Sequence, residues 1–142
     1  METTGPSAEW VARMRELYDK SPVHAHMGLT LEEVGNGTAT VRLAVKQEYI
    51  NGLGVIHGGV ITAGLDSALL QSIRSRCADG DHLTTVELKV NFLEPANPPT
   101  LTFSGSATRV GSSLGVAHAE ALDAQGKHVA TAMGTIAIKR RK

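Results

Sequence analysis

The chain has 142 residues, 42% of them hydrophobic and 20% charged, and its formal net charge at pH 7 is zero. This length suits one domain, residues 1–142, that can bury a sizeable core. The balanced charge gives no case for a nucleic-acid or membrane-surface partner, and no apolar run approaches the roughly 18 residues of a membrane span. Cys77 is the only cysteine, which excludes an intrachain disulfide and a cysteine-based zinc cluster. The N-terminus lacks the basic start and apolar stretch of a signal peptide, so we expect a cytoplasmic protein.

The apolar pattern predicts a short helix, two strands, a long helix and four further strands. The first helix, about Ser7–Asp19, has apolar residues at three- and four-residue spacing and stops at Ser21-Pro22. Alternating segments between turn residues predict the strands, which are about Met27–Val34, Thr38–Val45, Thr84–Phe92, Leu101–Arg109, Val116–Leu122 and Val129–Ile138. Because tight turns join most consecutive strands, the sheet should be antiparallel, in an α+β domain with its core at about residues 27–138.

Between about His57 and Cys77 the period is helical, and apolar residues cover most of the circumference. We therefore expect a central helix with the sheet wrapped around it. Asp66 is the only ionisable side chain from Gly58 through Ile73. An unpaired carboxylate in such a setting is costly, so it needs hydrogen-bond partners. Two interpretations stay open. One is a structural aspartate that is hydrogen-bonded, or exposed on a polar strip of the helix with Thr62, Ser67 and Gln71. The other is a functional acid.

Glycines crowd the segment leading into this helix, which reads NGLGVIHGGVITAGLD from Asn51 to Asp66. Gly58-Gly59 stands where the helix starts, and the first turn of a helix has N–H groups without intrahelical partners. Such groups can form an oxyanion hole, although a tight strand-to-helix turn also explains the glycines. Asp66 lies eight residues beyond Gly58, roughly 12 Å along a helix. If both act on one substrate, the acid must come from a second chain, which predicts a two-fold dimer with paired sites.

The sequence resembles the hotdog-fold acyl-CoA thioesterases, and most closely their phenylacetate-pathway and 4-hydroxybenzoyl-CoA branch. The likeness rests on Asn51, on His57-Gly58-Gly59, on the acid eight residues after the first glycine, and on the stretch Thr85–Pro95. It implies a sheet wrapped around the helix, a homodimer with one continuous sheet, and often a tetramer of two dimers. It also implies thioester hydrolysis at the dimer interface, with an acyl-CoA as substrate, no metal, and no cofactor beyond the coenzyme A that the substrate carries.

The resemblance also implies a role for each matching position. Gly58 would donate its backbone N–H to the thioester oxygen, and Asn51 would orient the attacking water or the carbonyl group. Asp66 of the partner subunit would be the general base or the nucleophile, Thr85 would help to place the water, and His57 would hold the loop. Further substrate contacts are expected from Gly59, Ser67 and Arg109. The candidates for the coenzyme A nucleotide also include Arg74, Arg76 and the basic tail Lys139-Arg140-Arg141-Lys142, for which a solvated tail is the alternative.

Two other functions stay open. A hotdog-fold lyase acting on enoyl- or hydroxyacyl-thioesters would be expected to carry a catalytic histidine further along the helix, and Leu69–Ser72 contains none. A non-catalytic acyl-CoA-binding module would not need Asn51, Gly58 and Asp66 together. The histidines show no metal-ligand spacing, and His24-Ala25-His26 is expected in a loop, which could line the site if it folds over it. The acyl group is not specified; the aromatic residues that could reach it are Trp10, Tyr18 and Tyr49.

Overall fold

The structure, a computed structural model, describes residues 4–142. The helices are α1 (Ala8–Asp19), α2 (Pro22–Met27) and α3 (Gly58–Arg74), and a single 3-10 turn, η1, spans Gln47–Tyr49. The strands are β1 (Leu29–Gly35), β2 (Thr38–Ala44), β3 (His82–Phe92), β4 (Thr100–Val110), β5 (Leu114–Asp123) and β6 (His128–Lys139). Among residues 4–142, no helix combines the length and the apolar character needed to cross a membrane.

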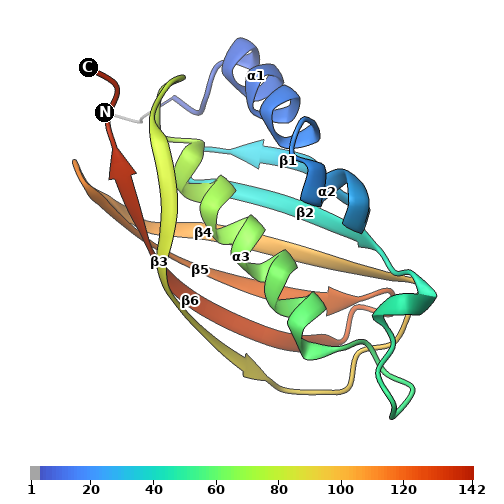
Figure 1. Cartoon of the computed structure of the whole chain (residues 1–142). Coiled ribbons are helices and arrows are strands. Elements are labelled where there is room, and N and C mark those ends of the chain that lie inside the picture. Colours follow the sequence, from blue (N-terminus) through green and yellow to red (C-terminus); the bar gives the residue numbers. More distant parts are fainter. Residues whose placement is uncertain (1–3) are drawn as a thin grey trace.

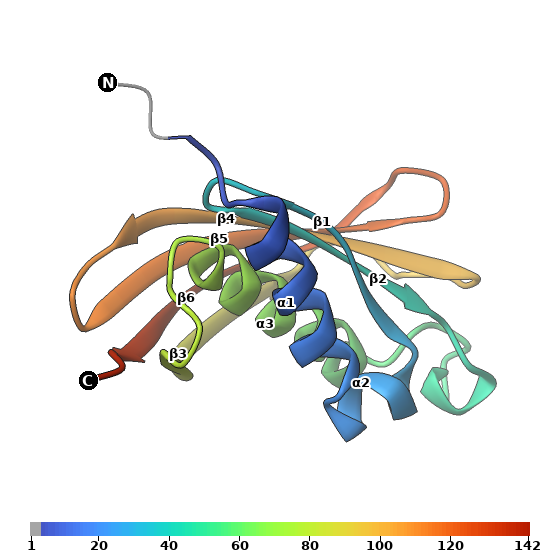
Figure 2. The same cartoon turned by 90° about the horizontal axis from the view of Figure 1, so that it is seen from above.

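The six strands form one sheet in the order β1-β2-β4-β5-β6-β3, and every pair of neighbours is antiparallel. Figure 1 shows the sheet curving around α3. Figure 2 shows that α1 and α2 lie on the same side of the sheet as α3. The predicted α+β fold, with an antiparallel sheet around one central helix, is therefore confirmed.

Two glycines set how closely α3 approaches the sheet. A Cβ atom on Gly105 of β4 would overlap the carbonyl oxygen of Ala68, and one on Gly64 of α3 would overlap the ring of Phe103. Both approaches are far closer than van der Waals contact, so glycine is required at each position. This close packing fixes α3, and with it the height at which the polar side chains of the helix stand above the sheet.

Helix α2 differs from the expectation of a loop. Pro22 does not only end the first helix; it also occupies the first turn of α2, where its fixed φ and missing N–H cost nothing. Gly28 closes α2 with a φ of 82°, a left-handed conformation that favours glycine. Consequently His24 and His26 are helical, and β1 begins at Leu29 rather than at Met27.

Strand β3 lies at an edge of the sheet and contains a bulge between Thr85 and Glu87. A bulge adds one residue, so the alternation of faces shifts along the strand. Thr85 therefore faces the helix side although the alternation of the sequence groups Val86 with Leu88 and Val90. Val86 is instead 59% exposed.

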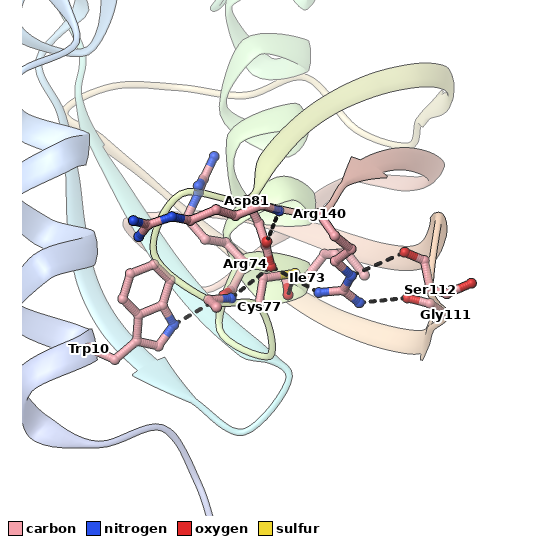
Figure 3. A network of polar contacts seen from close by, with 10 residues as sticks. Trp10, Ile73, Arg74, Cys77, Asp81, Gly111, Ser112 and Arg140 are labelled. Atoms are coloured by element: carbon pink, nitrogen blue, oxygen red, sulfur yellow. Dashed lines mark hydrogen bonds and ion pairs between the residues drawn. The ribbon is translucent and has the colours of Figure 1, made fainter.

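The C-terminal segment is anchored rather than free (Figure 3). The Arg140 guanidinium forms an ion pair of 3.0 Å with Asp81 and donates hydrogen bonds to the carbonyl oxygens of Gly111 and Ser112. The backbone N–H of Arg141 donates to Asp81 as well. The alternative of a purely solvated basic tail is therefore wrong for Arg140, which joins the end of β6 to two neighbouring loops.

Candidate active site

The carboxylate of Asp66 is hydrogen-bonded to strand β3. The hydroxyl of Thr85 donates to Asp66 Oδ1 over 2.7 Å, and both side chains are partly buried. Thr84, one residue earlier, is exposed. The helix and the bulged strand thus bring together two of the residues that the sequence proposes, and they distinguish Thr85 from its neighbour.

Asp66 opens onto a cavity of about 700 Å³ between α3 and the N-terminal helices. Ser67 lines it as well, and its hydroxyl shares a hydrogen bond of 2.7 Å with the hydroxyl of Tyr18. Burial raises the pKa of Tyr18 to about 12, so its phenol is neutral near pH 7. The His24 ring stacks on Tyr18, with ring centroids 3.7 Å apart. Tyr18, one of the aromatic residues that could reach the acyl group, thus lines the same cavity as Asp66.

The N-terminus of α3 presents one free backbone donor. His57 is the N-cap: its Nδ1 accepts the N–H of Gly59 over 2.8 Å, and its carbonyl oxygen accepts from Val60 and Ile61. Within residues 4–142, no acceptor takes the N–H of Gly58. Gly58 is therefore the N–H available to a ligand, whereas the N–H of Gly59 is already engaged.

Asn51 shapes the glycine-rich loop. Its side-chain oxygen accepts the backbone N–H groups of Leu53 at 2.9 Å and Val55 at 3.3 Å. Only the amide nitrogen is left to meet a substrate or a water. Asn51 thus stabilises the loop, and His57 stabilises the start of the helix. Any direct contact of the Asn51 side chain with a substrate must use its Nδ2 donors.

The first residue and the middle of α3 face separate cavities within one chain. Gly58 lines a second cavity, of about 340 Å³, together with Ile61, Phe92 and Pro95, among others. Asp66 does not line that cavity, and Gly58 does not line the larger one. Both residues belong to one continuous helix, so the separation of roughly 12 Å expected from the helical rise applies.

The arginines that are candidates for contacts with coenzyme A lie in different parts of the structure. Arg74 lines the cavity of Asp66, and burial lowers its pKa. Arg76 is turned to the β1–β2 turn, where its Nε donates to the side-chain oxygen of Asn36. Arg109 is exposed on β4 and lines neither cavity.

Further polar residues line the larger cavity, among them Gln71 and the stacked His24. The sequence reasoning placed Gln71 on the polar strip of the helix without a role in the site. Its position could have been found, because it lies four residues beyond Ser67 and so on the same face of the helix. For His24 the sequence left a place at the site open, but the deciding signal is tertiary, since nothing local indicates that α2 folds back so that His24 stacks on Tyr18 of α1.

Comparison with known proteins agrees with this architecture. The thioesterase superfamily matches residues 53–130, which include most of the glycine-rich loop, all of α3 and Thr85. A protein of Saccharolobus solfataricus named "Putative esterase" is 31% identical over 134 residues, 93% of this chain and 94% of that protein.

Solved structures agree as well. A thioesterase family protein from Silicibacter pomeroyi has a TM-score of 0.87 at 26% identity, covering 93% of this chain and 99% of its own. The PaaI protein from the phenylacetic acid degradation operon of E. coli shares the fold, with a TM-score of 0.85 at 23% identity over 96% of each chain. With the family match spanning more than half of the sequence, the chain belongs to the thioesterase superfamily, and its fold is the hotdog fold of that family.

Proposed function

We propose that the protein is an acyl-CoA thioesterase that hydrolyses a small or medium acyl-CoA, aryl groups included, to the free acid and coenzyme A. Membership of the thioesterase superfamily supports thioester hydrolysis in general. The observation that carries the finer proposal is the 2.7 Å hydrogen bond between Thr85 and Asp66 at the wall of a large cavity. It leaves a partly buried carboxylate oriented and one of its oxygens, Oδ2, available for chemistry.

The residues suit a thioester in particular. A thioester carbonyl is electrophilic and thiolate is a good leaving group, so a carboxylate and an oxyanion donor can suffice without a serine nucleophile. Asp66 would remove a proton from the attacking water, or attack the carbonyl carbon itself, while the Gly58 N–H binds the developing oxyanion. A single turnover in oxygen-18 water distinguishes the two, because label in the Asp66 carboxylate supports direct attack.

The separation of Gly58 from Asp66 supports a site shared between two chains. One chain would supply the Gly58 N–H and its partner the carboxylate of Asp66, in a homodimer with two equivalent sites. The free edge of β3 suits such an assembly, because it carries exposed Val86 and, at its end, Phe92, which is 55% exposed. Pairing of two β3 edges would cover these side chains and extend the sheet. Two such dimers would then form the tetramer that the resemblance implies.

A subunit-mixing experiment tests the shared site. Asp66→Asn removes the acid, and Gly58→Pro removes the donor at a helix position that tolerates proline. Each variant alone should be nearly inactive. A heterodimer of the two would contain one intact site, so random mixing should restore about a quarter of the wild-type activity. No recovery despite verified heterodimers would show that Gly58 and Asp66 do not serve one site across subunits.

The substrate class is tested with a panel of acyl-CoA esters varied in chain length and aromaticity, with release of the thiol measured. The wild type should release coenzyme A from some members, and Asp66→Asn should not. Full activity of Asp66→Asn would contradict the assignment of the acid. Binding of the esters without release would favour the acyl-CoA-binding module instead.

A further inference from the structure

Arg74, the last residue of α3, carries a guanidinium without a bonded partner. Its backbone carbonyl accepts a hydrogen bond of 3.2 Å from the Trp10 indole (Figure 3), but within residues 4–142 no hydrogen bond or ion pair engages its guanidinium. The side chain is partly buried and lines the cavity of Asp66. A positive charge in the last turn of a helix is favourable because of the helix dipole. The dipole, however, does not require that charge to face a cavity.

The carboxylates at this end of the cavity are bonded to other groups. The charged or titratable residues that line it beside Arg74 are Arg13, Asp79, Asp81 and His82. Asp79 is 3.1 Å from Arg13, and Asp81 forms an ion pair of 3.0 Å with Arg140 and accepts the N–H groups of Ala78 and Arg141. Both acids favour the charged form of Arg74 from a distance, and His82 is exposed. The N–H groups of the Arg74 guanidinium therefore stay available to a ligand.

Asp66, Leu70 and Arg74 stand four residues apart, so they form one row along α3, and all three line the cavity. The row leads from a carboxylate across an apolar side chain to a guanidinium. The Cα atoms at its two ends are roughly 12 Å apart along the helix. Long helical side chains lean toward the helix N-terminus, which shortens the gap between the guanidinium and Asp66. Met14 and Leu17 of α1 line the same cavity and add apolar surface.

We propose that the cavity takes dicarboxylic acyl groups and that Arg74 binds the carboxylate at the far end of the acyl chain. This inference rests on the proposed thioesterase function, which places the thioester carbonyl near Asp66, and it adds the acyl class and the residue that recognises it. A carboxylate matches the fork of N–H donors on a guanidinium and can accept two parallel hydrogen bonds from it. Leu70 would contact the methylene groups between the two ends. A chain of roughly six to eight carbons suits the gap, because a carbon–carbon bond is about 1.5 Å long and an extended chain advances less than that per bond.

The experiment compares acyl-CoA esters of matched chain length that differ in the terminal group. Hexanoyl-, adipyl- and 6-aminohexanoyl-CoA end in a methyl, a carboxylate and an ammonium group, and octanoyl- and suberyl-CoA repeat the first comparison in a longer chain. For the wild type, kcat/KM should favour the carboxylate over the methyl group in at least one chain length by about ten- to 150-fold, the range for a hydrogen bond to a charged group. The ammonium ester should be the poorest substrate of the series.

Two variants test the residue. Arg74→Met keeps an unbranched apolar side chain and removes the guanidinium. It should lower kcat/KM for the preferred dicarboxylic ester by the same factor, and kcat/KM for the methyl-terminated ester should stay equal or rise. Arg42→Met is the matched control, because Arg42 is exposed on β2 and lines neither the cavity of Asp66 nor that of Gly58. This variant should retain the whole preference.

A wild type that hydrolyses the methyl-terminated esters as well as the dicarboxylic ones at both chain lengths would overturn the proposal. A preference that survives in folded Arg74→Met would overturn the role of Arg74. An equal fall in kcat/KM for every ester in that variant would also overturn it, because the guanidinium would then bind a phosphate of coenzyme A or support the fold. The wild-type series needs no variant, so poor folding of Arg74→Met cannot rescue the idea. Failure to hydrolyse any ester of the wider panel is a different result, which would refute the proposed function and this inference with it.

Discussion

Replacing Thr85 by valine tests whether the hydrogen bond to Asp66 orients a catalytic carboxylate. The substitution keeps the shape of the side chain and the β-branching that strands favour, and it deletes the hydroxyl that donates over 2.7 Å. A hydrogen bond to a charged group contributes about 1.5–3 kcal/mol. If that stabilisation is fully used in the transition state, kcat/KM should fall by about ten- to 150-fold, since about 1.4 kcal/mol corresponds to a factor of ten.

The chain offers a matched control. Thr84 is the preceding residue on the same strand and is exposed, so Thr84→Val makes the same chemical change outside the site. Thr85→Ser restores a hydroxyl and should recover most of the activity. Both controls are assayed by release of coenzyme A from the best ester of the panel, with melting temperatures to confirm folding.

The pattern across the three variants decides the question. A loss of less than twofold in Thr85→Val would refute the argument that this hydrogen bond matters for catalysis. An equal loss in Thr84→Val would refute its localisation, because an effect on the strand as a whole would then suffice. A loss confined to KM would place Thr85 in substrate binding rather than in orienting the acid.

Three further predictions concern other contacts. Gly58→Pro should lower kcat by about 10²–10³-fold, the usual effect of losing one oxyanion donor. Gly58→Ala keeps the N–H, so its kcat should fall far less. An equal fall in kcat for both variants would indicate crowding against Phe92 instead. Gly105→Ala should lower the free energy of unfolding, measured with denaturant, by about 1–3 kcal/mol or more, because its Cβ would overlap Ala68. Gly5→Ala is the control: its Cβ would meet nothing closer than 3.7 Å, so the free energy of unfolding should not change. The pKa of Asp81 is lowered to about 2 from an ordinary 3.8 by hydrogen bonds from the N–H groups of Ala78 and Arg141 and by the Arg140 guanidinium. The carboxylate therefore stabilises the fold at pH values above 3.8, and this stabilisation is lost as the pH falls toward 2. The gap in melting temperature between wild type and Asp81→Asn should therefore narrow over that range, and a constant gap would contradict it.

Local sequence signals predict the order and type of the main elements because each has a strong period or a turn at its ends. The strand after the long helix shows where this reasoning stops. Alternation alone groups Val86 with Leu88 and Val90, but the bulge after Thr85 turns Val86 outward. A bulge depends on how a strand pairs with its neighbour, and β3 pairs with β6, which is distant in the sequence.

The same limit applies to the N-terminal helices. Ser21-Pro22 is a correct stop signal for α1, yet the same proline is also a good first residue for α2. Which role dominates depends on the residues after the proline and on tertiary packing. The hydrogen bond between Tyr18 and Ser67 attaches this region to α3, and no spacing rule connects residues 49 positions apart. The candidate acid, the glycines and Thr85 could be proposed from the sequence, whereas the cavity that joins Asp66, Tyr18 and Gln71 could not.

The hydrogen bonds at the start of α3 are compatible with the proposal that one helix contributes to two sites. A helix N-terminus offers several donors, but His57 takes the N–H of Gly59 with its ring and accepts the next two with its carbonyl oxygen. This leaves the N–H of Gly58 at the surface of one cavity, while Asp66 faces another. Gly58 and Asp66 belong to the same helix, which packs closely on Gly105 through Ala68, so a change of packing there would move both residues together. In the proposed dimer, a shift of α3 in one subunit would misplace the donor of one site and the acid of the other, so packing changes at Gly105 should impair both proposed sites at once.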